Sequence, residues 1–263
     1  MLLKDKNAII YGAAGAAGSA VAQAFAREGA RVYLTGRNVE ALEMMAKAIT
    51  SAGGAAEAAR VDALDEQAIE NHASAVAKRA GAIDISFNAI GIPQPGIQGI
   101  PLAQLSAESF TLPIATYTRS HFLTARAAAR RMLERRSGVI LMHTPEPARL
   151  AAPLVGGMGP AWAAMEALSR ALSAELGPQG IRTVCLRTTG IPETAAYGNV
   201  IGLHARAFGS TREQFQGMIE GMTHRRRATT LAELGNVAAF LASDLASAMT
   251  GSVANLTGGL IAD

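Results

Sequence analysis

The stretch Gly12-Ala13-Ala14-Gly15-Ala16-Ala17-Gly18 decides the fold, because it lies between an apolar run over 6–11 and a run of small helix-forming residues over 18–28. A strand that leads into a glycine-rich turn and then into a helix is typical of a dinucleotide-binding loop. Glycines there let the backbone approach a pyrophosphate, and the helix start offers free N–H groups and a positive dipole end. We therefore predict a nucleotide site at Gly12, Ala14, Gly15, Ala17 and Gly18. The alternative is a tight turn that serves only packing.

Outward from this loop, short apolar runs alternate with longer helical stretches. The pattern predicts strands over 6–11, 31–35, 57–61, 83–88, 139–143, 182–186 and 252–256, and helices over 18–28, 40–51, 65–79, 110–134, 159–176 and 231–242. Such alternation indicates βαβ units with right-handed crossovers, which stack helices on both faces of one parallel sheet. We found no internal repeat and no linker. The prediction is an α/β fold with a doubly wound parallel sheet, in one domain over residues 1–263.

Composition and charge narrow the function classes. Of the 263 residues, 49% are apolar and 17% charged, which suits a well-buried core and argues against disorder. The one cysteine, Cys185, excludes an internal disulfide and a cysteine-based metal cluster, so we predict no metal site and a buried strand residue. No run of about 20 apolar residues occurs, and the start lacks a secretory h-region, so we expect a cytoplasmic protein without a membrane segment.

The formal net charge is mild, at +3, and the arginine clusters are short and lack interleaved aromatic residues. They are typical of solvated helix faces and loops, so we predict no nucleic-acid partner.

The end of the second expected strand indicates which nucleotide binds. Sites for NAD usually carry Asp or Glu there, to bind the ribose 2′-hydroxyl. Here the strand ends Thr35-Gly36-Arg37, without a carboxylate. A guanidinium suits a 2′-phosphate as a bidentate and permanently charged partner. We therefore predict NADP(H) as the cofactor rather than NAD(H). The alternative is that Arg37 is a solvated loop cation and the choice of nucleotide is loose.

Six further features carry a family resemblance: the aspartate after the third strand, the turns over 87–91 and 189–194, the approach to the sixth strand over 177–182, and the C-terminal segments over 240–244 and 250–259. Over nearly its whole length the sequence resembles the short-chain dehydrogenase/reductase family. The resemblance implies a Rossmann fold and hydride transfer with a nicotinamide cofactor. It also implies further cofactor contacts from Asp62, Ala63, Asn88, Ala89, Gly91, Gly190, Ile191 and Thr194.

The resemblance breaks at the family's usual chemistry. Members use a Tyr-x-x-x-Lys pair, a Ser that binds the substrate oxygen and an Asn that holds a relay water. Counted from the neighbouring matched segments, the Tyr and Lys positions fall on Met158 and Trp162, and the Ser and Asn positions on Pro145 and Tyr117. No lysine follows Lys78, so no Tyr-x-x-x-Lys can stand anywhere beyond it.

Three interpretations follow. In the first, the chain is an NADP(H)-dependent oxidoreductase with a relocated acid, Tyr117, while Thr144 binds the substrate oxygen; Glu146, His143 and Tyr197 are weaker candidates. In the second, it is a catalytically inactive NADP-binding protein that serves as sensor, scaffold or partner subunit, with Trp162 stacked on the nicotinamide or excluding it. In the third, it reduces an activated C=C or C=N bond, where water can protonate the product.

Of the three, we favour an NADP(H)-dependent oxidoreductase that acts on a small apolar carbonyl, enone or imine. Loss of turnover in Tyr117→Phe would distinguish the first interpretation from the third.

Two expectations concern assembly and substrate access. The resemblance implies a homodimer or homotetramer paired through the helices over 110–134 and 159–176. The alternative is that these helices bury their apolar faces only against the sheet. The segment over 195–226 resembles a mobile substrate loop, whose apolar underside we expect from Phe208, Phe215, Met218 and Met222.

Overall fold

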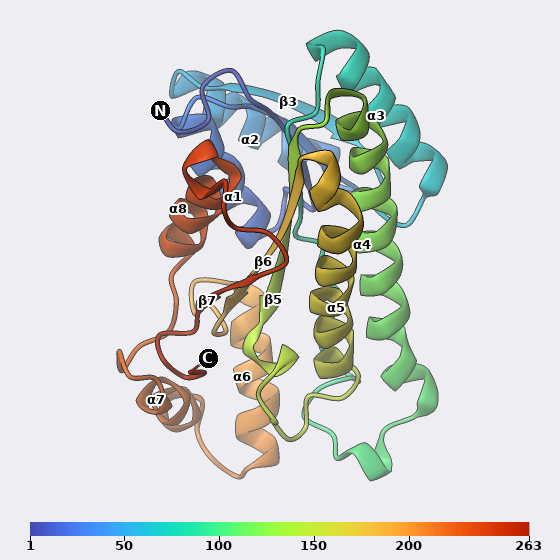
Figure 1. Ribbon diagram of the computed structural model, residues 1–263. Coiled ribbons are helices and arrows are strands. Elements are labelled where there is room, and N and C mark those ends of the chain that lie inside the picture. Colours follow the sequence, from blue (N-terminus) through green and yellow to red (C-terminus); the bar gives the residue numbers. More distant parts are fainter. Residues whose placement is uncertain (263) are drawn as a thin grey trace.

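The protein, described here for residues 1–262 as a computed structural model, is built on one seven-stranded sheet with the order β3-β2-β1-β4-β5-β6-β7. All six strand pairs are parallel. The strands are β1 (Asn7–Tyr11), β2 (Arg31–Gly36), β3 (Ala55–Arg60), β4 (Ile85–Asn88), β5 (Gly138–Pro145), β6 (Ile181–Thr188) and β7 (Val253–Leu256) (Figure 1). The doubly wound parallel sheet expected from the sequence is confirmed.

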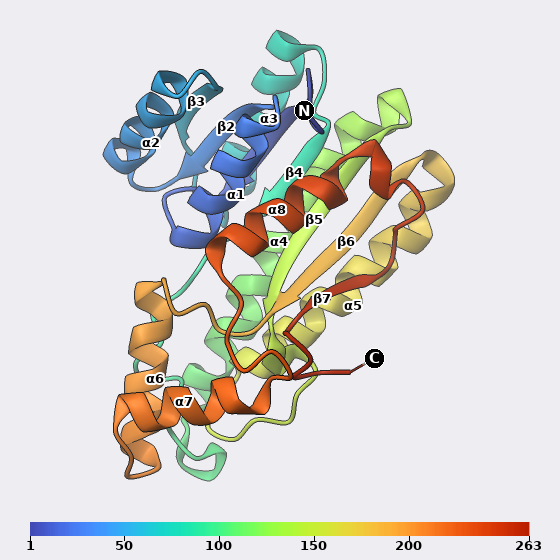
Figure 2. The ribbon, with the colours of Figure 1, turned by 90° about the vertical axis from the view of Figure 1, so that its left-hand side faces the viewer.

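Helices cover both faces of this sheet. On one face lie α1 (Ala16–Arg27), α2 (Val39–Ser51) and α8 (Leu231–Ala242), and on the other α3 (Glu66–Ala80), α4 (Ala107–Arg135) and α5 (Met158–Leu176) (Figure 2). The helix α4 begins three residues earlier than the pattern predicted, because the Ser106 side chain caps it by accepting the Ser109 N–H. No helix of the described residues is long and apolar enough to cross a membrane.

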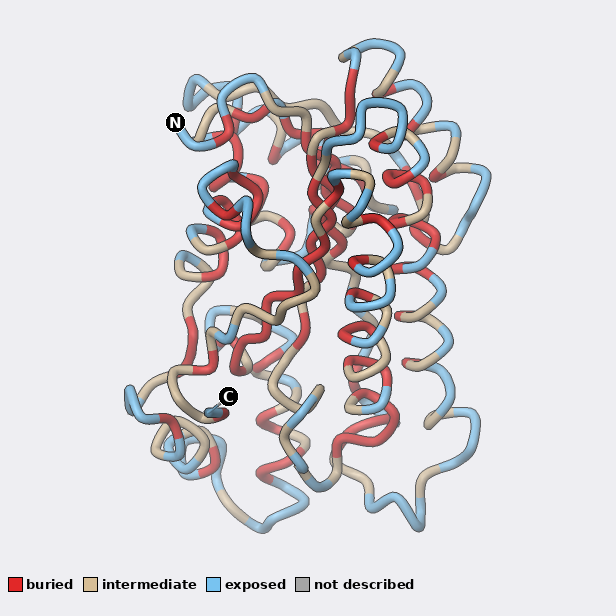
Figure 3. The backbone as a smooth tube through the Cα atoms, viewed as in Figure 1, coloured by how far each residue is buried: buried red, intermediate tan, exposed pale blue. Residues whose placement is uncertain are grey.

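Each face of the sheet has its own apolar core, and the buried residues follow the strands through the centre of the molecule (Figure 3). Alternation along β5 sends Val139 and Leu141 toward α1 and α8, and Ile140 and Met142 toward α3, α4 and α5. Cys185 on β6 is fully buried in the second core, as predicted. The same alternation continues to the end of β5, where successive side chains point to opposite faces of the sheet.

The carboxyl edge of the sheet is where a ligand is expected. The strand order reverses between β1 and β4, and such a switch point opens a crevice at that edge. Two further helices, α6 (Ala195–Ala207) and α7 (Arg212–Met222), lie beyond it (Figure 2).

The segment over 195–226 is thus largely helical rather than a loop, and it has a small core of its own. Of the four residues expected on its underside, only Phe215 is buried, and Phe208 stacks on it from outside at 5.6 Å between ring centroids. Phe208 is 52% exposed, and Met218 and Met222 are each 51% exposed, so the expectation of a buried underside was wrong for these three side chains. Periodicity did not show which face of each short helix would turn toward the other.

Candidate functional site

The loop after β1 is built so closely that two glycines cannot be replaced without moving backbone. Gly12 has φ +71, and a Cβ there would lie 2.8 Å from the backbone of Ala89 and Ile90 after β4. A Cβ on Gly18 would lie 2.5 Å from the Gly12 carbonyl oxygen. These contacts bring the loop, the start of α1 and the turn after β4 together.

The N-terminus of α1 is open. Its N-cap, Gly15, provides no side-chain hydrogen bond, and its first turn carries no acidic residue. By contrast, the starts of α2 and α3 are capped by the side chains of Asn38 and Asp65. Ala14 and Gly15 are exposed and Ala17 is half-buried. Free N–H groups at a helix start suit a pyrophosphate, so these residues fit the nucleotide that the sequence implied.

The end of β2 presents Arg37 to solvent. Gly36 ends the strand, and Asn38 turns away to accept the Ala41 N–H at 3.2 Å, which caps α2. Arg37 is exposed and forms no ion pair with another residue of 1–262. Its guanidinium is therefore available to a ligand beside the loop after β1.

The turns after β3 and β4 are held by their own side chains. Asn88 is buried, donates to the Thr124 hydroxyl at 3.0 Å and accepts the Ile90 N–H at 3.0 Å. Asp62 accepts the Leu64 N–H at 3.0 Å. The remaining expected cofactor contacts of this region, Ala63, Ala89 and Gly91, lie in the same two turns, and Gly91 faces open space.

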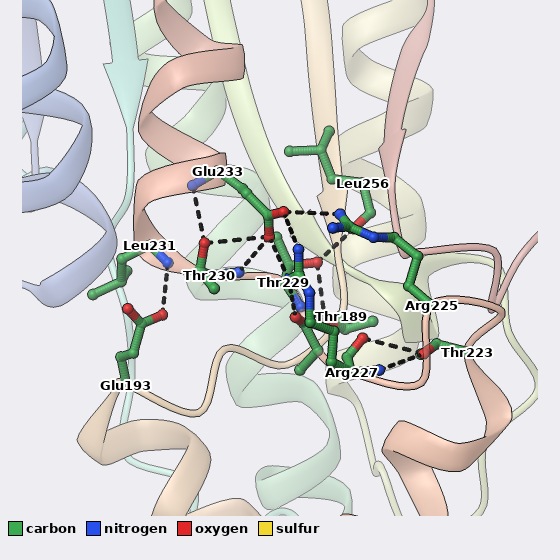
Figure 4. A network of polar contacts seen from close by, with 11 residues as sticks. Thr189, Glu193, Thr223, Arg225, Arg227, Thr229, Thr230, Leu231, Glu233 and Leu256 are labelled. Carbon is green, nitrogen blue, oxygen red and sulfur yellow. Dashed lines mark hydrogen bonds and ion pairs between the residues drawn. The ribbon is translucent and has the colours of Figure 1, made fainter.

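The turn after β6 is tightly covered and anchored. A Cβ on Gly190 would lie 2.5 Å from the Tyr197 ring, Ile191 is buried, and Thr194 caps α6 by accepting the Tyr197 N–H. The next anchor is Glu193, which accepts the Leu231 N–H at 2.7 Å and so caps α8 (Figure 4).

The same close-up shows the connection from α7 to α8. Thr229 donates its N–H to the Thr189 hydroxyl at 2.7 Å, and Glu233 pairs with Arg225 and Arg227 (Figure 4). The network therefore fastens both ends of the α6–α7 segment to α8.

An apolar cluster occupies the positions where the family's Tyr, Lys and Asn were counted. Met158 is fully buried, Trp162 is 8% exposed and Tyr117 is 6% exposed, and the three share one cluster between α4 and α5. The Tyr117 and Trp162 rings lie 6.4 Å apart between centroids. Burial raises the pKa of Tyr117 to about 12, although hydrogen bonds from the Ile92 backbone and the Trp162 side chain lower it. The phenol is therefore neutral at physiological pH.

The structure places Thr144 apart from this cluster. Thr144 is fully buried and donates its hydroxyl to Glu166 Oε1 at 3.0 Å. Glu166 in turn accepts two hydrogen bonds from the Arg187 guanidinium, at 2.8 Å and 2.7 Å. By the alternation of β5, Pro145 points to the opposite face. A contact of Thr144 with a substrate would require its hydroxyl to leave Glu166.

Glu146 and His143, two of the weaker candidates, lie beyond the end of β5 and on that strand, and burial shifts the pKa of both. Burial raises the pKa of Glu146 to about 7, against the N–H groups of its own backbone and of Gly190, which lower it. His143 Nε2 lies 2.9 Å from the Thr188 hydroxyl, and burial lowers its pKa to about 4, so it is neutral at physiological pH. Little in the sequence indicated the surroundings of Glu146, since its hydrogen-bond partner Gly190 lies 44 positions further along the chain.

The fold and this edge of the sheet define a dinucleotide-binding protein of the Rossmann type. Comparison with known proteins gives the family: a family model described as enoyl-(acyl carrier protein) reductase matches residues 12–261. The uncharacterized oxidoreductase YxbG of Bacillus subtilis is 32% identical over 99% of this chain and 92% of that protein. The D-threitol dehydrogenase of Mycolicibacterium smegmatis is 27% identical over 98% of this chain and 93% of that protein.

Similar solved structures indicate the same family. The chain resembles NAD+-bound xylitol dehydrogenase with a TM-score of 0.92 and 25% identity, over 98% of this chain and 100% of that one. It resembles 7α-hydroxysteroid dehydrogenase, solved with NADH, with a TM-score of 0.85 and 28% identity, over 98% and 94% of the two chains. The chain belongs to the short-chain dehydrogenase/reductase family, and is an oxidoreductase of the nicotinamide-dependent type.

Proposed function

We propose that the chain is an NADP(H)-dependent oxidoreductase that transfers hydride to or from a small apolar carbonyl, enone or imine, at a site unlike the family's usual one. The observation that carries the proposal is the pairing of two features at one sheet edge. The uncapped N-terminus of α1 and exposed Arg37 follow neighbouring strands, and an apolar cluster of Tyr117, Met158 and Trp162 lies near the ends of β4 and β5.

The preference for NADP(H) rests on charge. Arg37 offers a permanent positive charge and a forked set of donors, which suits a 2′-phosphate. A carboxylate at this place would instead favour the ribose 2′-hydroxyl of NAD(H). The turns with Gly12, Asn88 and Gly190 would hold the rest of the cofactor.

The chain's own residues shape the chemistry. When bound, the nicotinamide supplies or accepts the hydride. Burial keeps the Tyr117 phenol neutral, so its proton is available for a hydrogen bond to a substrate atom. We therefore assign the substrate-orienting role to Tyr117 rather than to Thr144, whose proton goes to Glu166. The apolar walls of Met158 and Trp162 favour an apolar substrate and exclude water.

Titration calorimetry with NADPH and NADH tests the cofactor proposal. We expect the wild type to bind NADPH at least about tenfold more tightly, and Arg37→Glu to lose that preference, since about 1.4 kcal/mol corresponds to each factor of ten. Arg170→Ala, at an exposed arginine on α5, is the matched control and should keep the preference. Equal affinity for the two nucleotides, or an unchanged preference in Arg37→Glu, would contradict the proposal.

A second candidate function is nucleotide binding without turnover, in which the chain acts as sensor, scaffold or partner subunit. The observation that favours it is the burial of Trp162 where the family carries its lysine, together with the absence of any lysine after Lys78. Tight NADPH binding with no reduction of any carbonyl, enone or imine in a panel would select it.

We further propose that the chain assembles as a homodimer or homotetramer through α4 and α5. Three large apolar side chains of α4 support this: Leu112 is 49%, Phe122 46% and Leu133 39% exposed.

A further inference from the structure

Glu146 stands where the polypeptide leaves β5, at the carboxyl edge of the sheet. It opens a short 3-10 helix, Glu146–Ala148, and lies between Pro145 and Pro147. The two proline rings fix φ on either side of it, so the backbone that carries this carboxyl has little freedom. The residue is therefore held in place at the edge where the cofactor and substrate are expected.

The carboxyl of Glu146 is enclosed by the turn after β6. The Gly190 backbone N–H hydrogen-bonds to it, and the Tyr197 ring lies directly over Gly190. The atom Glu146 Oε2 is buried without a hydrogen-bond partner among residues 1–262, and so is the Tyr197 hydroxyl. A buried polar atom left without a partner is costly unless a ligand or water meets it. Two such atoms at this edge indicate that the place is shaped for a polar group of a bound molecule.

Within residues 1–262, no positive charge is among the causes that shift the pKa of Glu146. The nearest cation in sequence, Arg149, is exposed at the end of the same 3-10 helix. The titratable group that interacts with Glu146 is Tyr197 on α6, which also interacts with Glu220 on α7. His143, three residues before Glu146 on β5, is neutral at physiological pH. The first two turns of α5, over 158–165, carry no charged residue. The next charged residue of α5, Glu166, is bound to Arg187. These surroundings favour the protonated carboxyl, and they also raise the pKa of Tyr197, by burial first and then by Glu220 and Glu146.

From this geometry we propose that Glu146 is the acid–base group of the reaction. The inference rests on the proposed function and adds the proton donor to it. In the direction of reduction the O–H bond of the carboxyl breaks, and its proton bonds to the substrate oxygen, nitrogen or carbon that becomes electron-rich as hydride arrives. The carboxylate then regains a proton from water. In oxidation the carboxylate removes the proton from the substrate hydroxyl or amine.

The protonation state of Glu146 can be measured without any cofactor. Infrared difference spectra between the wild type and Glu146→Gln should show a protonated-carboxyl band at pH 5.5 that disappears with a midpoint near pH 7. Glu175→Gln, at an exposed position of α5, is the control and should show no such band. If Glu146 is already ionised at pH 5.5, the inference is overturned.

Turnover gives the second readout. With NADPH and a panel of activated carbonyls, enones and imines, Glu146→Gln should lose about 100-fold or more in kcat, the usual contribution of a general acid. The wild-type rate of reduction should fall above pH 7, and this limb of the pH profile should disappear in Glu146→Gln. Glu146→Asp should restore part of the rate, and it replaces the amide variant if that variant does not fold. Tyr117→Phe should raise KM and leave the pH profile in place.

The outcomes separate the two proposals. Wild-type turnover with the same kcat and pH profile in Glu146→Gln overturns the role of Glu146 and leaves the proposed function standing. A wild type that binds NADPH but reduces no member of the panel overturns the proposed function, and the role of Glu146 with it.

Discussion

The loop after β1 and the group of buried side chains after β5, called the side-chain region below, lie at the same edge of the sheet, but they are built differently. The loop consists of glycines and backbone: Gly12 and Gly18 are required because a Cβ would strike neighbouring backbone. The side-chain region consists of large or charged side chains, such as Trp162, Glu146 and Glu166, which are positioned by partners far along the chain. A backbone site keeps its form while side chains change around it. The side-chain region after β5 is therefore the half in which we propose a departure from the family's usual residues.

The largest effect on stability is expected in the side-chain region after β5, from Arg187→Leu. This change removes both guanidinium hydrogen bonds to Glu166, an ion pair in which each side chain is at most 5% exposed. Breaking one side of a buried pair costs about 3–5 kcal/mol, because the remaining charge stays buried. Unfolding in urea, followed by circular dichroism, measures the loss.

The matched control is the double variant Glu166→Leu/Arg187→Leu. Replacing a whole buried pair by apolar residues is often close to neutral, so we expect the double variant to regain most of the lost stability. If the double variant is as unstable as Arg187→Leu, or if Arg187→Leu costs less than about 1 kcal/mol, the side-chain region is not stabilised by the ion pair of Glu166 and Arg187.

A smaller effect on stability, but a clear one on binding, is expected in the loop half from Gly12→Ala. An alanine at φ +71 is strained, and its Cβ would lie 2.8 Å from the Ala89 and Ile90 backbone. We expect about 2–3 kcal/mol of destabilisation from strain and overpacking together. The affinity for NADPH should fall more than about tenfold, since the loop must shift from the start of α1. Calorimetry and thermal unfolding measure the two losses.

Gly177→Ala serves as the control for Gly12→Ala. Gly177 has helical dihedrals at the far end of the molecule, and a Cβ there would meet nothing within 4 Å. It should not lower the melting temperature. If Gly12→Ala changes the melting temperature and the NADPH affinity no more than Gly177→Ala does, the loop is looser than its contacts indicate. The loop and the side-chain region would then not differ in how strictly they are built.

The same contrast explains how much the sequence could predict. The sheet, its helices and the glycine loop followed from periodicity and from local signals, such as Gly12 directly after a strand. Arg37 could also be found locally, as the residue after β2. Glu146 could not, because it is buried and meets the Gly190 backbone only in the folded chain. The hydrogen bond of Thr144 could not be predicted for the same reason, because its partner, Glu166, lies on another element, α5.

The smallest effect is expected where the α6–α7 segment is fastened to α8, from Glu233→Gln. Hydrogen bonds and ion pairs with Arg227 and Arg225, together with the Thr230 backbone, hold the pKa of Glu233 below its ordinary value, although burial works against them. A carboxyl with a lowered pKa adds stability above its unfolded-state pKa of about 4.3 and loses it as the pH falls further. We therefore expect Glu233→Gln to cost about 1 kcal/mol at pH 7, with the difference from wild type shrinking below pH 4.

Thermal unfolding from pH 3 to pH 7 separates this charge effect from capping. Glutamine can still close the capping box with Thr230, so Glu233→Gln removes charge but keeps the cap. Thr230→Ala removes the cap, and its cost of about 1 kcal/mol should stay nearly constant over this range of pH. A loss in Glu233→Gln that does not vary with pH would mean that the arginines add nothing at this joint. The α6–α7 segment would then be fastened without the arginines, through backbone N–H groups of Leu231 and Thr229 that donate to the Glu193 carboxylate and the Thr189 hydroxyl.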